Sequence, residues 1–279
     1  MEIYISTLGR YTEKEQNTLK YISEKWKPST HVVVVEKEYK KYKQLLKDLD
    51  IIILPKNVKG LSANRQWLLE NSHSDFICFL DDDLDFNKRK EGSIQLKKCK
   101  NIDGLFKIWI NWLQNGYNLV GVSSRNGNNR ILSDYEDCTR IMSAYAFNRN
   151  TLIKENIRFD RINIMQDFDV NLSLLEKGYP NRVSYKYAHS QSKGSGAKGG
   201  CSIYRTPELK RKGSFRLAYL HPKVVKVRSK ITKTGWDNME SKAGIEGKVS
   251  VDVTIFWKKA LKNKIENIQQ KGIQDYIKE

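Results

Sequence analysis

The sequence predicts an α/β fold in which a mainly parallel sheet is covered by helices on both faces. Short apolar runs alternate with helical patterns through the first third of the chain. These runs are continuously apolar, as in "HVVVVE" at 31–36, which is typical of parallel strands buried on both faces. The chain has 279 residues, 39% of them hydrophobic, which is enough to build one large globular domain.

The elements of the first third follow one another in a regular order. Apolar runs predict strands at 2–7, 31–36, 51–54 and 76–80. Helical spacing of apolar residues predicts intervening helices at 13–26, 41–49 and 61–72. Ligands of such sheets bind beyond the carboxyl ends of the strands, so functional residues are expected there.

The rest of the chain is less regular. Phe168, Leu172 and Leu175 recur at helical spacing, and Gly178 follows as a helix stop signal. Segment 191–200 is rich in Gly, Ser and Lys and is expected to be mobile. The chain from 206 onward is expected to be a basic extension. Further helices are predicted within 92–116, 166–180 and 254–272, and further strands at 117–124, 139–150 and 181–190.

The composition limits the classes of function. The formal net charge is +18, which favours polyanionic partners such as nucleic acid or an anionic membrane surface, although lysine-rich surfaces can lack any function. No apolar run is long enough to span a bilayer, and no signal peptide is recognised, so a cytoplasmic protein without a membrane partner is expected. The four cysteines are widely spaced, which argues for reduced thiols rather than a zinc site.

One acidic run raises the main functional question. In "FICFLDDDLDF" the carboxylates of Asp81, Asp82, Asp83 and Asp85 follow a buried strand with no cation among them. Such carboxylates repel one another unless a cation is bound. Mg²⁺ or Mn²⁺ prefers oxygen ligands and is commonly held by one or two carboxylates together with substrate phosphates. We therefore expect a metal–phosphate site, the alternative being a solvated acidic loop.

Five stretches in order carry a specific resemblance. "IYISTLGR", "VVVVE", "GLSANRQWLL", "FICFLDDDLDF" and "QDFDVNLSLLEKG" resemble the GT-A glycosyltransferase fold over about residues 1–190. That family uses nucleotide-diphosphate sugars and an Asp-x-Asp motif. The resemblance implies a catalytic domain at 1–205, with a nucleotide-sugar half at about 1–90 and an acceptor half at about 91–205, and then the extension at 206–279.

The resemblance also implies roles for residues of the nucleotide-sugar half. Glu36 would face the nucleobase and Arg65 would reach the nucleotide, although a strand-end acid and a surface arginine are ordinary alternatives. Asp83 would hold the metal, and no role follows for Asp85. Residues Thr7, Gly9 and Arg10 would line the nucleotide pocket, and Asp81 and Asp82 would contact the ribose or uracil side.

In the acceptor half the resemblance implies a catalytic base. An inverting transfer needs a base for the acceptor hydroxyl, and Asp167 occupies the family's position at a helix start. Gln166 stands where the family often has Glu, and Asp167 could instead only cap its helix. Asp169 is the neighbouring alternative. His189 would complete the metal site, unless it is a structural histidine.

The glycine-rich loop and the tail suggest the acceptor. A loop at 190–205 that closes over the diphosphate would exclude water, with Lys193, Ser195 and Lys198 as donor-binding residues, although a plain linker is the alternative. The stretch "HSQSKGSGAKGGCSIYR" is similar to the TET/JBP-associated glycosyltransferases of bacteriophages, which implies 5-hydroxymethylcytosine or another 5-hydroxymethylpyrimidine in DNA as acceptor and the host cytoplasm as location. DNA contacts are expected from Arg205, Lys210, Arg211, Lys212, Arg216, Lys223, Lys226 and Arg228.

Three other functions stay open from the sequence. The chain could build cell-surface polysaccharide or glycolipid, or be a non-catalytic DNA-binding module. A nucleotidyltransferase is less favoured, because no early Gly-rich nucleotidyl-transfer signature is present. The sugar, the stereochemistry, base flipping and the oligomeric state do not follow from the sequence.

Overall fold

A computed structural model describes residues 1–12, 14–191, 199–232 and 248–262 of the chain. The expected donor-binding residues Lys193, Ser195 and Lys198 lie outside the described residues. Most of the helix expected at 254–272 also lies outside them.

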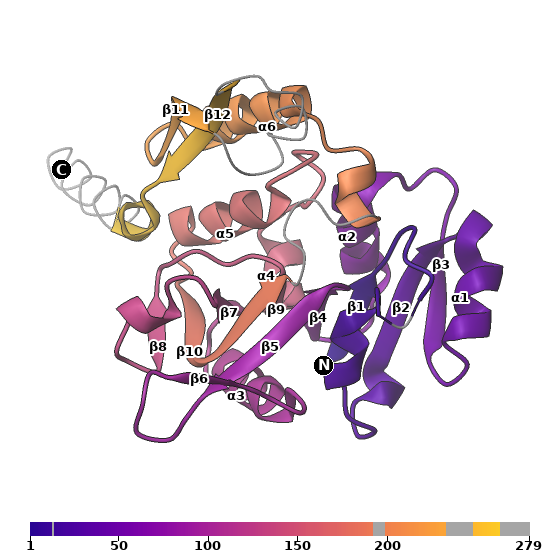
Figure 1. The fold of residues 1–279 in the computed structure, drawn as a ribbon. Helices are drawn as coiled ribbons and strands as arrows, with labels where there is room; N and C mark the ends of the chain where they lie inside the picture. Colours follow the sequence, from indigo (N-terminus) through magenta and orange to yellow (C-terminus); the bar gives the residue numbers. More distant parts are fainter. Residues whose placement is uncertain (13, 192–198, 233–247, 263–279) are drawn as a thin grey trace, which may run out of the picture.

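One large mixed sheet organises the chain up to Gln191, in the order β3-β2-β1-β4-β9-β7-β10-β5-β6, with β8 paired to β10 (Figure 1). The first four strands run parallel, as the buried apolar runs predicted, whereas beyond β4 the pairs are antiparallel except for the parallel pair of β7 and β10. The strands are β1 (Glu2–Ser6), β2 (Thr30–Val35), β3 (Asp50–Leu54), β4 (Phe76–Asp81), β5 (Leu84–Arg89), β6 (Leu96–Lys98), β7 (Leu119–Ser124), β8 (Tyr135–Asp137), β9 (Ala144–Asn148) and β10 (Asn181–Gln191).

Helices cover both faces of the sheet, which confirms the predicted α/β class. The α-helices are α1 (Tyr39–Leu45), α2 (Gly60–Asn71), α3 (Asp103–Gln114), α4 (Arg149–Lys154), α5 (Gln166–Glu176) and α6 (Pro207–Leu220). Short 3-10 helices are η1 (Asn17–Tyr21), η2 (Lys27–Ser29), η3 (Glu36–Glu38), η4 (Asn128–Arg130) and η6 (Gly200–Ile203).

Strand β4 is the centre of two hydrophobic layers. Its side chains alternate, so Ile77 and Phe79 enter the layer under α2, α4 and α5, whereas Cys78 and Leu80 enter the layer under α3. All four are almost fully buried. Burial on both faces explains why this strand reads as one continuous apolar run, and it fixes the position of the aspartates that follow.

Residues 14–26, the described part of the helix expected at 13–26, form no α-helix. Only the 3-10 turn η1 appears there, because Thr18 is bound to the end of β4 instead of to its own helix. Its N–H donates to the carbonyl of Asp82 at 3.1 Å and its hydroxyl donates to the carbonyl of Asp81 at 2.6 Å. The hydroxyl also accepts the N–H of Leu84 at 2.9 Å. The segment therefore braces the aspartate turn.

Two other boundaries differ from the expectation. Strand β5 begins directly after Asp83, where the sequence predicted no element, and it pairs with β10. Strand β9 covers only the second half of 139–150, because Ser143 adopts a left-handed conformation with φ of 62° immediately before it. Residues 254 and 255 belong to a strand rather than to the final helix.

The C-terminal extension is packed on α5. It contains α6 and a hairpin of β11 (Val225–Thr232) and β12 (Lys248–Ile255), drawn above α5 in Figure 1. Leu217, Val224 and Ala260 are fully buried in one cluster with Leu172 and Leu175 of α5. The extension is thus basic on its surface but shares a core with the helix that carries Asp167.

Candidate active site

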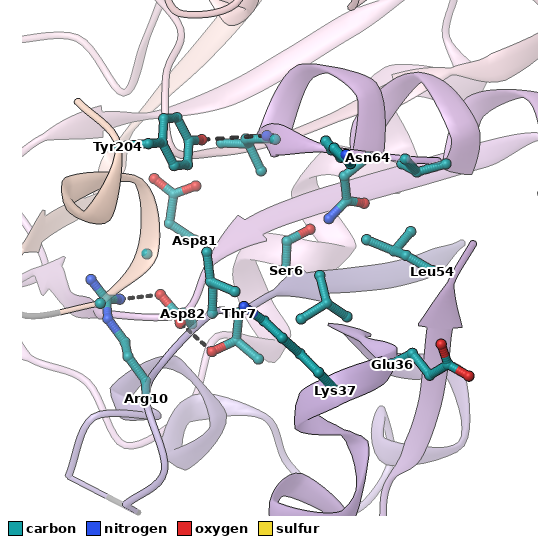
Figure 2. A pocket seen from close by; sticks show the side chains of 18 of the residues that line it. Ser6, Thr7, Arg10, Glu36, Lys37, Leu54, Asn64, Asp81, Asp82 and Tyr204 are labelled. Atoms are coloured by element: carbon teal, nitrogen blue, oxygen red, sulfur yellow. Dashed lines mark hydrogen bonds and ion pairs between the residues drawn. The ribbon is translucent and has the colours of Figure 1, made fainter. Parts of the chain in front are cut away.

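A cavity of about 620 Å³ opens at the carboxyl ends of β1, β2, β3 and β4. This is the edge at which parallel sheets bind ligands. Figure 2 shows Ser6, Asn64, Asp81 and Tyr204 around it. Its wall also includes the residues Thr7, Arg10, Glu36, Lys37, Leu54, Lys56, Lys59, Asp82, Asp83, Gln191, Gly199, Gly200 and Arg205.

Asp81 is held from behind by Arg65. The guanidinium donates to its Oδ1 at 3.0 Å and lies over the rings of Phe79 and Tyr145. Arg65 is 3% exposed and is not among the residues that line the cavity, so the expected contact with the nucleotide stays a prediction. Its neighbour Asn64 lines the cavity in its place.

Asp82 supports the loop that follows β1. It accepts a hydrogen bond from the Thr7 hydroxyl at 2.5 Å and forms an ion pair with Arg10 (Figure 2). Burial raises the pKa of Asp82 to about 7, although Arg10 and Thr7 act in the opposite direction. Because both oxygens already have partners in the protein, Asp82 positions Thr7 and Arg10 more than it faces the ribose or uracil side. The N–H of Gly9 donates to Glu38 at 3.0 Å, which also fixes this loop.

Asp83 also lines the cavity, and each of its two carboxylate oxygens has a partner in the protein. Arg10 donates to its Oδ2 at 3.0 Å and Gln191, the last residue of β10, donates to its Oδ1 at 3.3 Å. Burial and the nearby charge of Asp81 raise the pKa of Asp83, whereas Arg10 lowers it. Arg10 therefore acts as the internal cation of this cluster in the ligand-free chain.

The end of the glycine-rich segment closes one side of the cavity. The N–H of Gly200 donates to the carbonyl of Leu8 at 2.7 Å. A Cβ at Gly199 would lie 2.7 Å from Cγ of Arg10, and the residue has a φ of 86°, so only glycine fits there. Tyr204 accepts the N–H of Leu61 at the start of α2 at 3.3 Å (Figure 2). The chain after 198 thus contacts both the β1 loop and α2.

Asp167 lies in the first turn of α5, near enough to Asp81 for the charge of Asp81 to act on it. Burial raises its pKa, while Arg65 lowers it and Asp81 raises it further. Met165, two residues before it, has a left-handed φ of 64°. That conformation is costly for a residue with a side chain and is often found at functional sites. A carboxylate with a raised pKa at a helix start can accept a proton near neutral pH.

Asp169 has a different environment from Asp167. It is fully buried, accepts from Arg161 at 3.0 Å, and contacts Nε2 of His221 at 2.8 Å. The other ring nitrogen of His221 lies 2.7 Å from Glu176. This network ties α5 to the end of α6, so Asp169 is a structural residue and not a second candidate base. This hydrogen-bond network could not be recognised in the sequence, because Asp169 and Glu176 are far from His221 along the chain.

His189 is buried at 3% exposure, and neither ring nitrogen has a hydrogen-bond partner. Burial lowers its pKa to about 4, so the ring is neutral. In the sheet it stands opposite Phe86, whereas Gln191 stands opposite Leu84 and contacts Asp83. The structure therefore brings Gln191 into contact with Asp83, and the role of His189 in a metal site stays a prediction.

The donor set fits a hard divalent cation only in part. Asp81 and Asp83 provide carboxylate oxygens at the cavity, and the unpartnered ring of His189 could act as a nitrogen ligand. Among the described residues, no three His, Cys, Asp or Glu side chains form a ready metal cluster. This pattern suits a cation that takes most of its ligands from a diphosphate and water.

The remaining cavity residues lie at its rim. Glu36 is exposed and pairs with Lys56 at 3.3 Å, so its expected contact with a nucleobase would be made from the edge. Lys37, Lys56 and Lys59 line the cavity but were not singled out from the sequence. These lysines follow the carboxyl ends of β2 and β3, where parallel sheets bind ligands, and that position could have identified them from the sequence.

The expected DNA-binding residues divide into three groups. Arg205 lines the cavity, so it faces the donor site. Lys210 is buried at 8% exposure and is not available as a surface contact, because α6 turns it toward the protein. The other six are exposed on α6, on the turn after it and on β11, namely Arg211, Lys212, Arg216, Lys223, Lys226 and Arg228.

Comparison with known proteins identifies the family. Residues 1–200 match the sequence profile of the TET-associated glycosyltransferases. The chain belongs to this family. It is therefore a glycosyltransferase of the nucleotide-sugar-dependent GT-A class, as the resemblance predicted. A search of curated proteins found no match.

Solved structures share the fold at low sequence identity. Glucosyl-3-phosphoglycerate synthase from Mycobacterium tuberculosis, solved with Mn²⁺, UDP and phosphoglyceric acid, aligns with a TM-score of 0.50 and 11% identity over 82% of each chain. S. aureus TarS 1–349 in complex with UDP aligns with a TM-score of 0.50 and 14% identity over 80% of this chain. The match spans 66% of that TarS chain. No helix among the described residues is long and apolar enough to cross a membrane.

Proposed function

We propose that this glycosyltransferase moves a sugar from a nucleotide-diphosphate sugar, with UDP-sugar as the favoured donor, to the hydroxyl of 5-hydroxymethylcytosine in DNA. The observation that carries the proposal is the position of Asp167 beside the Asp81–Asp83 cluster, in a chain whose family is TET-associated. The net charge of +18 and the exposed basic face of α6 support a polyanionic acceptor.

The donor would occupy the cavity at the ends of β1 to β4. Its nucleoside would lie between the β1 loop and the rim that carries Glu36 and Lys37, and its diphosphate would point to Asp83. Asp83 would hold Mn²⁺ or Mg²⁺, with His189 as the proposed second protein ligand. The cation, when bound, neutralises the charge that develops on the leaving diphosphate. That TarS and the synthase were solved with UDP supports this choice of nucleotide.

Asp167 would act as the general base. It accepts the proton of the acceptor hydroxymethyl group as that oxygen forms a bond to the anomeric carbon. At the same time the bond from the anomeric carbon to the diphosphate oxygen breaks, and both electrons leave with the nucleoside diphosphate. Arg65, which contacts Asp81, lowers the pKa of Asp167 against the effect of burial and so favours the ionised form that a base requires.

The proposal is tested with labelled UDP-glucose, UDP-N-acetylglucosamine and UDP-galactose, Mn²⁺ and three acceptors. These are a duplex with 5-hydroxymethylcytosine, the same duplex with cytosine, and a polyol phosphate polymer. Label is expected only in the hydroxymethylated duplex and only with metal present. Transfer to the polyol phosphate with no label in DNA would show that the chain builds a surface polymer instead.

A further inference from the structure

An arginine and two aromatic rings extend outward from Asp167. Phe168, the next residue in α5, has its ring centroid 5.0 Å from the guanidinium carbon of Arg140. The same ring packs edge-on against Trp257, with centroids 5.6 Å apart and an angle of 79°. The three side chains come from the segment between β8 and β9, from α5 and from the C-terminal extension. We call them the Arg140 platform.

Arg140 is exposed, and among the described residues it forms no ion pair. It lies near enough to Asp167 and His189 for its charge to lower the pKa of both. It does not line the cavity, so it lies outside the site proposed for the donor. An exposed cation at this place meets whatever delivers the acceptor hydroxyl to Asp167.

The platform has the chemistry for a nucleic-acid strand. A guanidinium offers a rigid fork of donors that matches the oxygens of a phosphate, and stacking on Phe168 limits the rotamers that it can adopt. Partly exposed aromatic rings next to an arginine provide stacking surfaces for bases. A neutral glycan acceptor would gain little from an unpaired arginine at this position, because it has no anion to pair with it.

We propose that the Arg140 platform docks the acceptor strand, with Arg140 binding a backbone phosphate next to the modified nucleotide. The inference rests on the proposed DNA acceptor and adds a contact outside α6 and β11. Since a phosphate contact carries no sequence information, it would orient the strand without selecting its sequence.

The test compares Arg140→Gln with Lys47→Gln, which removes one exposed charge after α1 in the far donor half. Both proteins are assayed for the affinity of a hydroxymethylated duplex and for its KM over a range of salt concentrations. Arg140→Gln is expected to lower the affinity for the duplex and to raise its KM, each roughly tenfold, and by the same factor for different flanking sequences. It should also reduce the salt slope of log K by about 0.9, as for one lost phosphate contact. Lys47→Gln should match the wild type, and Arg140→Lys should recover the salt slope but only part of the affinity.

The outcomes distinguish failure of the Arg140 platform from failure of the proposed function. If the wild type modifies hydroxymethylated DNA but Arg140→Gln equals Lys47→Gln in KM and salt slope, the platform does not dock the strand and the proposed function stands. If the wild type modifies no DNA at all, both fail. Equal unfolding midpoints for the two variants exclude misfolding as the cause of a loss.

Discussion

Replacing His221 with Ala should loosen the joint between α5 and the C-terminal extension. The ring is 2% exposed and bridges Asp169, which is fully buried, and Glu176, which is 31% exposed. A hydrogen bond to a charged group contributes about 1.5–3 kcal/mol, and the half-open Glu176 end is discounted for solvent screening. We expect His221→Ala to lower the free energy of unfolding by about 3 kcal/mol.

The pH dependence of this loss gives a second, independent readout. Burial alone would lower the pKa of His221, but the hydrogen bonds to Asp169 and Glu176 outweigh it and raise the pKa above the ordinary 6.5. The folded state therefore binds the proton more tightly than the unfolded state. The stabilisation is complete below about pH 6.5 and is lost as the pH rises through the raised value.

Urea unfolding of the wild type and His221→Ala at pH 6 and pH 9 measures both effects. His31 is the control, because it also lies between two carboxylates, Glu2 and Asp50, but its side chain is 18% exposed, against 2% for His221. His31→Ala should cost less than about 1 kcal/mol. A loss for His221→Ala that equals the His31 value, or that grows from pH 6 to pH 9, would refute the reasoning.

Three further substitutions test the site. Gly199→Ala should abolish donor binding, because the added Cβ would meet Arg10. The control is Gly116→Ala, which has a similar φ of 94° but lies in open space and should keep donor binding. Calorimetry with UDP and Mn²⁺ compares the two variants, and equal affinities would contradict the assignment. Asp83→Asn should remove metal-stimulated transfer. The variant should unfold at no lower temperature than the wild type, because the substitution relieves repulsion from Asp81. A lower thermal midpoint would show that Asp83 is a structural residue. Thr18→Val should lower the free energy of unfolding by about 1–3 kcal/mol, because it removes two buried hydrogen bonds at the aspartate turn; an unchanged urea midpoint would show that the brace is dispensable.

The sequence predicted the parallel half of the sheet well because local pattern and tertiary burial agree there. Strand β4 is buried on both faces, so each of its residues is apolar, and the ligand-binding edge follows from the strand direction alone. Four of the five stretches that resemble GT-A enzymes contribute residues to the cavity, and the fifth contains Asp167.

What could not be predicted depends on contacts between distant residues. The apolar spacing at 13–26 indicated a helix, but hydrogen bonds from Thr18 to the end of β4 stabilise a different conformation. The different partners of Asp82 and Asp83, which have the same local sequence, are set by Arg10 some 72 residues away. The Asp169–His221 contact likewise spans 52 residues and leaves no periodic trace.

The most direct test of the central claim is nucleoside analysis by mass spectrometry of a hydroxymethylcytosine duplex incubated with a UDP-sugar and Mn²⁺. We predict a glycosylated hydroxymethylcytosine with the wild-type protein. Asp167→Asn should form none while still binding UDP. Unmodified nucleosides with the wild type under every donor, or full modification by Asp167→Asn, would contradict the account.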